Sequence, residues 1–486
     1  MTVAATLCPL NESALRRAAA GRAHLPAYDR RQTAIGVVHL GPGAFHRAHQ
    51  AAYFDDLLGK DPRWAIAGVS LRSNDVARAL GPQDALYTLA ILDETVSYRI
   101  IGSMKEIFCG AQDPARALAR LSAPETRLVT LTVTEKGYCL GPDGALDFNH
   151  ADIRRDLEAQ DAPASAIGWI VAALRRRKAA GARPFVAMSC DNLAGNGEKL
   201  KSAVVALARA RDAELARWIE GEARFPSTMV DAITPATNDA LRKSVAEATG
   251  YADAWPVQRE AFASFVIEDG VDETFPDLGG VGAVMTSDVA AHERAKLRML
   301  NGAHSTLAYL GLACGHETVG EAMRDLDLAA FIDDMMRLEI APSLKAPRGL
   351  DLDDYRRALL KRFRNPAIQH RLAQIAWDGS QKLPIRLLGT IADNLAARRP
   401  IARLAAGVAA WMRFVRRAAL ARRDIVDPMA MRLSGVGLAC TDEPAADVDL
   451  FLTRTAIAPP ALAADPAFRK ALEGAYKEVM SQERAA

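Results

Sequence analysis

A chain of 486 residues is long for one domain, and a composition of 50% hydrophobic and 25% charged residues suits two or three folded domains. The formal net charge of +2 gives no global reason to expect a nucleic-acid partner or an anionic membrane. No signal-peptide pattern and no run of about 18 apolar residues is present, so we expect a cytoplasmic protein without membrane contact. Six scattered cysteines without a CxxC pair argue against disulfides and against a zinc site, and we therefore predict no metal.

Strand and helix patterns alternate along the first half of the chain, after an extension at 1–33 that includes an Ala/Arg-rich helical pattern. The predicted strands are 34–40, 64–71, 87–92, 98–101, 128–133 and 184–188, and the predicted helices are 45–58, 114–121 and 164–180. Apolar strands that alternate with helices are typical of a parallel sheet covered on both faces. This pattern predicts an α/β fold with a Rossmann-like sheet.

The second half of the chain is dominated by helical patterns rich in Ala, Leu and Arg. These patterns cover 293–311, 319–336, 352–363, 385–397, 401–421 and 466–480. We therefore predict a Rossmann-like dinucleotide-binding domain at 1–285, with its N-terminal extension, and a mostly helical substrate and catalytic domain at 286–486. The interface between two such domains is the default position for an active site.

A glycine turn follows the first strand of the predicted sheet, where a dinucleotide-binding turn is expected. Glycine there lets backbone amides approach a pyrophosphate, although the third glycine of GxGxxG is missing and an ordinary tight turn is the alternative. Pro42 has no amide hydrogen to donate. The predicted cofactor contacts at this turn are Gly41, Gly43, Ala44, Phe45 and, through its charge, Arg47.

Two further positions after strands are predicted to contact the cofactor. The second strand is followed by Arg72 and Asp75; the acid suits a ribose hydroxyl, whereas the arginine would tolerate a 2′-phosphate. Glu135 follows the 128–133 strand, and an ordinary turn is the alternative there. We prefer NAD as the cofactor and leave NADP open.

The helical pattern that opens the second domain carries three polar residues at a spacing suited to alcohol oxidation. At about 100° per residue, Lys296, Asn301 and His304 fall within about 140° of one another. A buried lysine beside a positive nicotinamide ring loses its proton more easily, so it can act as the base without zinc. Asn301 can donate to the alkoxide oxygen and His304 can orient the substrate. The alternative is an ordinary helix with a surface lysine, a capping Asn and a core His.

A second polar cluster, 189–192, directly follows the strand 184–188. Ligands collect at the carboxyl ends of parallel strands, so Asn192 is a candidate second donor to the alkoxide oxygen. An Asx turn or a helix cap is the alternative for this cluster.

Together these segments resemble the long-chain polyol dehydrogenase family, which includes mannitol 2-dehydrogenase, arabinitol dehydrogenase and fructuronate reductase. The matching stretches are 38–50, 131–138, 188–192, 225–231 and 296–304, in the family's order. The resemblance implies a Rossmann-like domain, a helical domain, and metal-independent hydride transfer between a nicotinamide cofactor and an open-chain sugar. It also implies roles for particular residues: acid/base for Lys296, oxyanion donors for Asn192 and Asn301, substrate contacts for His304, Val230 and Asp231, and a proton path for Glu293.

Within the family, the stretches 100–106, 134–139, 165–168 and 378–384 look most like fructuronate reductase, which converts D-fructuronate to D-mannonate. A uronate carries a carboxylate, and Lys382 and Arg386 are candidate cations for it by position, with ordinary surface charge as the alternative. Two departures put the substrate in doubt: Ala232 and Phe265 stand where relatives usually have Arg and Trp.

Two other functions stay open at this point. The alternative enzyme is a mannitol 2-dehydrogenase, which interconverts fructose and mannitol, or a related polyol dehydrogenase. The more remote alternative is a non-catalytic nicotinamide-binding sensor. The oligomeric state stays open too, with a monomer plausible.

Overall fold

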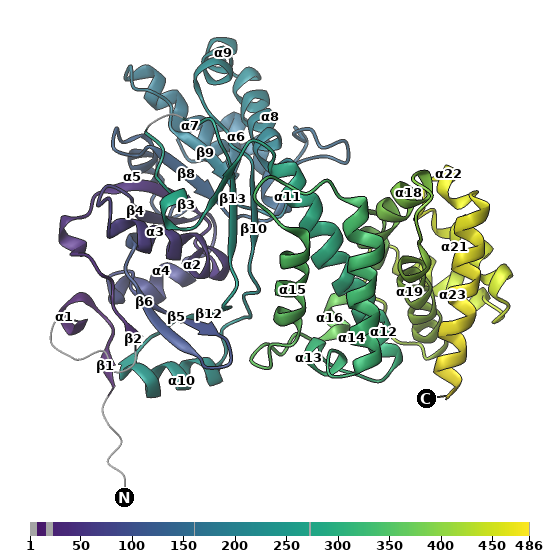
Figure 1. Ribbon diagram of the computed structural model, residues 1–486. Coiled ribbons are helices and arrows are strands. Elements are labelled where there is room, and N and C mark those ends of the chain that lie inside the picture. The colour runs from purple at the N-terminus through teal and green to yellow at the C-terminus, as the bar shows by residue number, and fades with distance from the viewer. Residues whose placement is uncertain (1–6, 16–22, 160, 272–273, 486) are drawn as a thin grey trace, which may run out of the picture. The chain divides into compact units, whose positions relative to one another are not determined.

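The computed structural model describes residues 7–15, 23–159, 161–271 and 274–485 (Figure 1). The chain divides into two compact units, residues 1–290 and 291–486. The Ala/Arg-rich helix that we expected within 1–33 falls largely on 16–22, outside the described residues; the part that is described forms α1 (Glu12–Leu15). None of the described helices is both long enough and apolar enough to cross a membrane.

A five-stranded parallel sheet forms the centre of unit 1. Its strand order is β7 (Met104–Cys109), β4 (Ala65–Ser70), β3 (Ile35–Leu40), β8 (Leu128–Leu131) and β9 (Val186–Ser189). Every neighbouring pair is parallel, which confirms the Rossmann-like α/β fold. The segment 104–109, for which we predicted no strand, forms one edge of this sheet.

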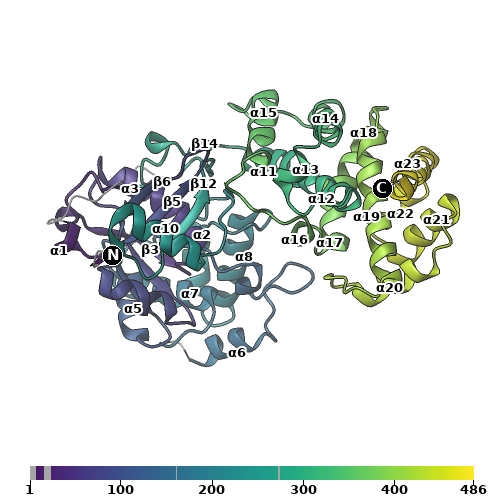
Figure 2. The ribbon, with the colours of Figure 1, turned by 90° about the horizontal axis from the view of Figure 1, so that it is seen from below.

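Alternate residues of each strand pack on opposite faces of this sheet, as the two-residue period of a strand requires. Val38 packs with one set of helices, and its neighbour Val37 packs with the set on the other face. The first set is α5 (Pro114–Ser122), α7 (Ala166–Ala179), α8 (Asn196–Arg209) and α9 (Ala213–Glu222); the second is α3 (Gln50–Leu58) with α2 (Ala44–Ala48) (Figures 1 and 2).

Two predicted strands do not join the central sheet. β5 (Tyr87–Leu92) and β6 (Ser97–Ile101) pair antiparallel in a separate sheet of order β12-β5-β6-β2, with β12 (Val257–Glu260) and β2 (Ala23–His24). The link between them, 93–96, is too short for the crossover that a parallel pair requires. A third sheet, which we did not predict, has the order β10 (Thr228–Asp231), β13 (Ser264–Glu268) and β14 (Val284–Thr286).

Unit 2 is helical, as expected, and its core surrounds α19 (Ala402–Leu420). This helix contacts α12 (Ala303–Ala313), α20 (Ala430–Ala439) and α23 (Pro466–Ala485). The other main helices are α13 (Val319–Ala322), α14 (Leu326–Asp334), α15 (Leu352–Phe363), α17 (Gly379–Leu383), α18 (Gly389–Ala396) and α21 (Pro444–Thr455). The helices α20 and α21 lie in a stretch for which we predicted none.

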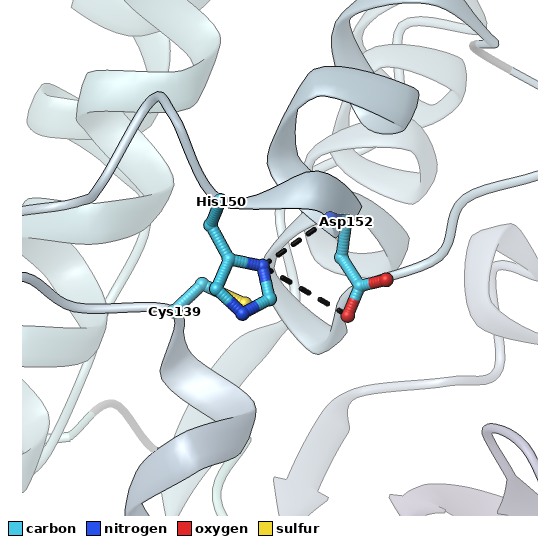
Figure 3. Close-up of side chains that lie close together, drawn as sticks. All are labelled: Cys139, His150 and Asp152. Atoms are coloured by element: carbon cyan, nitrogen blue, oxygen red, sulfur yellow. Dashed lines mark hydrogen bonds and ion pairs between the residues drawn. The ribbon is translucent and has the colours of Figure 1, made fainter.

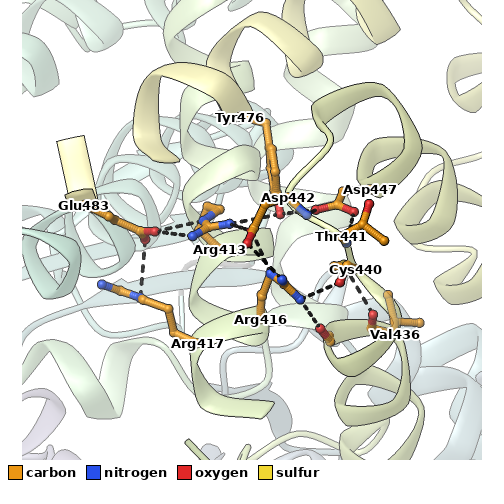
Figure 4. A network of polar contacts seen from close by, with 11 residues as sticks. Arg413, Arg416, Arg417, Val436, Cys440, Thr441, Asp442, Asp447, Tyr476 and Glu483 are labelled. Atoms are coloured by element: carbon orange, nitrogen blue, oxygen red, sulfur yellow. Dashed lines mark hydrogen bonds and ion pairs between the residues drawn. The ribbon is translucent and has the colours of Figure 1, made fainter. Parts of the chain in front are cut away.

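A network of ion pairs ties the C-terminal helix to the centre of unit 2 (Figure 4). Arg413 on α19 bonds to Asp442 and to Glu483 of α23, at 2.6 Å in each case. Arg416 binds the same Asp442 carboxylate, with Nε and Oδ1 2.7 Å apart. The hydrogen bond from Arg416, together with that from Arg413, holds the pKa of Asp442 well below its usual range. The two arginines are nearly buried, so they depend on these carboxylates for compensation.

We predict that Asp442→Asn lowers the free energy of unfolding at pH 7 by about 2 kcal/mol, somewhat less than for a fully buried pair because the carboxylate is partly exposed. Because its folded-state pKa is depressed, Asp442 stabilises the protein above its unfolded pKa of about 3.9, and this contribution is lost as the pH falls further. The gap between wild type and variant, measured by urea denaturation, should therefore narrow below about pH 4.

The exposed Arg469–Asp449 pair provides the control for this experiment. Asp449→Asn should cost less than about 1 kcal/mol, as for other surface pairs. An Asp442→Asn variant that unfolds like Asp449→Asn would contradict the prediction.

Candidate active site

Lys296 and Asn301 lie on a π-helical segment, Lys296–Gly302, between α11 (Val289–Ala295) and α12. The ordinary α-helix that we predicted here is wrong over these seven residues, and the angular spacing calculated at about 100° per residue does not apply to them. Lys296 is buried, with 9% of its surface exposed, and Asn301 is half-buried. Single π-helical turns inside α-helices occur frequently at functional sites. Glu293 lies on α11 just before this segment and is half-buried.

His304 occupies the first turn of α12 and is held between two rings. It stacks on Phe363 with ring centroids 4.8 Å apart, and the ring of His370 meets it edge-on at 5.0 Å. Nε2 of His304 is buried without a hydrogen-bond partner among the described residues, and so is Nδ1 of His370. Burial lowers the pKa of His304 well below its usual value, and nearby His370 and cations lower it further, so the ring is neutral at pH 7.

Lys382 and Arg386 lie near His304 and are not ordinary surface charges. Lys382 is half-buried at the end of α17, and its Nζ donates to the carbonyl of Ile375 at 3.3 Å. Arg386 follows on the π-helical segment Pro384–Leu388 and donates to Oγ of Ser305 at 3.0 Å. Burial lowers the pKa of Lys382, and it lowers that of Arg386 to about 10.

Unit 2 thus brings His304, Lys382 and Arg386 together and adds His370, which the sequence analysis missed. His370 lies just before α16 (Leu372–Ile375), and its backbone carbonyl accepts the N–H of Val319 at 3.0 Å. No local motif marks this histidine, because its role depends on the tertiary contact with His304.

In unit 1, Asn192 is exposed after the carboxyl end of β9. Its neighbour Asp191 has a structural role: it accepts from the amides of Val133 and Thr134 and from the hydroxyl of Tyr138. This carboxylate joins the loops that follow β8 and β9. Burial raises the pKa of Asp191.

The other predicted substrate contacts of unit 1 lie on β10. Val230 and Asp231 are buried there, and Val230 pairs in register with Phe265 of β13. Phe265 itself is fully buried and packs edge-on against the rings of His49 and Tyr53. Phe265, which stands where relatives usually have Trp, is therefore part of the core of unit 1.

The two glycines of the turn after β3 serve different purposes. Gly41 has φ +87°, and a Cβ there would stand 2.4 Å from the carbonyl oxygen of Thr132, so the fold itself requires glycine. Gly43 has an ordinary φ of −72°, and a Cβ there would meet nothing closer than 3.9 Å. Protein packing does not explain the second glycine, whereas a ligand close to the backbone does. Gly43 is exposed, and Ala44 and Phe45 beside it are half-buried, so the turn is accessible as its predicted cofactor role requires.

Arg47 is not available as a phosphate contact, and that prediction is corrected. The side chain is 1% exposed, its Nη1 donates to the carbonyl of Trp255 at 2.6 Å, and its guanidinium lies about as close to the ring of Tyr87 as to that of Trp255. The apolar surroundings of the first helical turn, formed by residues distant in sequence, take this arginine into the core of unit 1.

The remaining predicted cofactor residues are exposed. Asp75 begins α4 (Asp75–Leu80) and contacts Ser73 and Arg78. Glu135 begins a short 3₁₀ turn after β8. Arg72 is 75% exposed and pairs with Asp152 at 2.5 Å.

Comparison with known proteins agrees with this arrangement. The Rossmann domain of mannitol dehydrogenase matches residues 35–280, and the mannitol dehydrogenase C-terminal domain matches 288–480. The D-mannonate oxidoreductase of Escherichia coli K12 is 44% identical over 416 residues, which are 83% of this chain and 85% of the relative. The polyol:NADP oxidoreductase of Gluconobacter oxydans is 37% identical over 401 residues, 80% of this chain and 82% of that protein.

Solved structures with the same fold cover nearly the whole chain. Pseudomonas fluorescens mannitol 2-dehydrogenase, in a ternary complex with NAD and D-mannitol, is 36% identical with a TM-score of 0.81; 98% of this chain and 99% of that one are covered. A substrate-free D-sorbitol dehydrogenase is 31% identical with a TM-score of 0.90 and the same coverage. The chain therefore belongs to the mannitol dehydrogenase family and is an NAD(P)-dependent dehydrogenase of polyols or sugar acids.

Proposed function

We propose that this enzyme is a fructuronate reductase, which reduces the ketone of D-fructuronate to the secondary alcohol of D-mannonate. The observation that supports this proposal most strongly is the pair of cations beside His304. Neither Lys382 nor Arg386 has an ion-pair partner among the described residues, although both are half-buried. Cations in such a position favour an anionic ligand, and a uronate differs from a ketose in carrying a carboxylate. The 44% identity to a D-mannonate oxidoreductase supports the same substrate.

We propose that the two imidazoles bind hydroxyl or carboxylate oxygens of the same substrate. His370, like His304, has its pKa lowered by burial, and the charge of Lys382 lowers it further. A neutral imidazole offers one donor and one acceptor, which suits a chain of hydroxyl groups. Both rings have a buried nitrogen without a hydrogen-bond partner in the part of the chain that the structure describes, and a buried polar atom of this kind normally has one.

The proposed chemistry assigns the proton to Lys296. The nicotinamide cofactor supplies the hydride when bound, and we prefer NAD because Asp75, an acid that suits a ribose hydroxyl, is exposed at the start of α4. Lys296 gives its proton to the oxygen as the ketone is reduced, and burial makes the neutral amine that results acceptable. Asn192 and Asn301 donate hydrogen bonds to that oxygen, and Glu293 relays the proton to solvent. Val230 and Asp231 line the substrate site in this proposal.

Reduction of fructose to mannitol is the second candidate function. The specific observation in its favour is the 36% identity to a mannitol 2-dehydrogenase over nearly the whole chain. Since a ketose has no carboxylate, the two functions differ in what they require from Lys382 and Arg386.

We expect Lys296→Ala to lower kcat by about a thousandfold, the size of a lost general acid/base, while the affinity for NADH changes little. NADH oxidation with fructuronate and with fructose, alongside NADH fluorescence titration, measures both quantities. Lys201→Ala, on the exposed face of α8, is the control and should behave as wild type. Turnover undiminished in Lys296→Ala would remove the lysine from the mechanism.

Lys382→Gln and Arg386→Gln test the substrate. Each should raise KM for fructuronate by roughly 10–100-fold, since a hydrogen bond between charged groups contributes about 1.5–3 kcal/mol. The smaller activity with fructose should change much less. Arg371→Gln, which removes an exposed cation close by in the sequence, is the matched control. If the variants lose activity equally on both substrates, the carboxylate assignment fails although the enzyme is still a polyol dehydrogenase.

His370→Phe tests the second imidazole. Phe keeps an aromatic ring against His304 but cannot form hydrogen bonds, so kcat/KM for fructuronate should fall roughly tenfold. His370→Gln keeps a donor and an acceptor and should recover part of that loss. Equal activity of the two variants would show that the ring only packs against its neighbour.

A further inference from the structure

A cluster of three different metal-ligand types lies in unit 1 and includes none of the residues assigned above to substrate binding or catalysis. Cys139, His150 and Asp152 each offer one ligand atom, and these atoms all lie within 4.8 Å of one another (Figure 3). The cysteine is buried and the other two residues are at least partly accessible. Because Cys139 lies 11 positions before His150, the scattered cysteine pattern of the sequence does not mark this cluster.

The backbone explains how the three residues meet. Cys139 ends the short 3₁₀ turn 135–138 with φ +54°, and its carbonyl accepts the N–H of Asp147 at 2.9 Å. A bridge between Leu140 and Leu146 closes the loop in between. The chain thus returns to Cys139 just before α6 (Ala151–Glu158), whose N-cap is His150.

We propose that this cluster is a binding site for a thiophilic divalent cation of the zinc type, with water completing the coordination. Thiolate, imidazole and carboxylate are the donors that Zn²⁺ takes in proteins, and three protein ligands with one open position are typical of its non-structural sites. Bonds of about 2.0–2.3 Å place tetrahedral ligand atoms about 3.5 Å apart, so the side chains must move together by about 1 Å. The cation has no part in the hydride transfer proposed above.

Two existing contacts involve the proposed ligands: the first leaves a ring nitrogen of His150 available, and the second competes with the cation for Asp152. Nδ1 of His150 accepts the amide of Asp152 at 3.2 Å, which leaves the other ring nitrogen for a metal. The Asp152 carboxylate pairs with Arg72, but an exposed ion pair changes an equilibrium constant by about fivefold at most. Removal of Arg72 should therefore strengthen cation binding, whereas a merely structural cluster predicts no such gain.

The test measures Zn²⁺ binding to the full chain after chelator treatment, by competition with a chromophoric chelator. Wild type should bind one equivalent, and Co²⁺ in its place should give a thiolate-to-metal charge-transfer absorption band. Cys139→Ser should abolish the band, His150→Gln should weaken binding by at least about tenfold, and Arg72→Gln should strengthen it by up to about fivefold. Far-UV circular dichroism and the midpoint of thermal unfolding check that each variant is folded.

Cys314→Ser is the matched control, because Cys314 is an exposed thiol in unit 2 that could bind metal adventitiously. Its removal should leave the stoichiometry and the cobalt band unchanged. The proposal is overturned if wild type binds no better than Cys139→Ser, if Cys314→Ser loses the bound equivalent, or if a folded His150→Gln binds as wild type does. None of these outcomes depends on which sugar the enzyme reduces.

Discussion

The close approach of two π-helical segments fixes the proposed substrate groups of unit 2. A Cβ on Gly302, at the end of the first segment, would stand 2.9 Å from the carbonyl oxygen of Arg386 on the second, a distance that real Cβ atoms do not adopt. Without a side chain at 302, the two backbones come close enough for Arg386 to reach Ser305 and to act on His304. A larger residue at 302 would separate the segments and with them the cationic and the imidazole groups.

The π-helical turns also change the direction of the side chains that follow them. A π-helical turn inserts an extra residue per turn, so the side chains beyond it are rotated relative to those before it. Lys296 begins such a turn and His304 follows it on the same continuous helix. The π-helical turn therefore changes the angle about the helix axis between the proposed proton-transfer group and the proposed substrate contact. The constant angle of about 100° per residue that we used in the sequence analysis therefore does not give the directions of Lys296, Asn301 and His304.

The sequence predicted the central sheet and most of the helices because their patterns are local. Continuous apolar runs, and the glycine turn that follows the first of them, depend only on neighbours along the chain. The predictions from sequence were wrong where contacts between distant residues determine the structure. We predicted that β5 and β6 join the parallel sheet, that Arg47 contacts a phosphate, and that 296–302 is an α-helix. His370 was missed for the same reason, because its partners come from other helices. Helical spacing made Lys296, Asn301 and His304 candidates, and the family resemblance then selected the catalytic roles over the ordinary structural alternatives.

The two cations, Lys382 and Arg386, lower the stability of the folded protein when no anion is bound beside them. Burial lowers the pKa of both Lys382 and Arg386, which means that the folded protein binds their protons less tightly than the unfolded chain does. By linkage, this lowers the stability of the folded state wherever the unfolded chain keeps both groups charged, including neutral pH, and the loss is recovered only as the pH rises toward their unfolded values. Proteins tolerate such conflicts between local chemistry and stability mainly at functional sites. A bound carboxylate would relieve both the desolvation and the mutual repulsion of the two cations, whereas a neutral polyol would relieve neither.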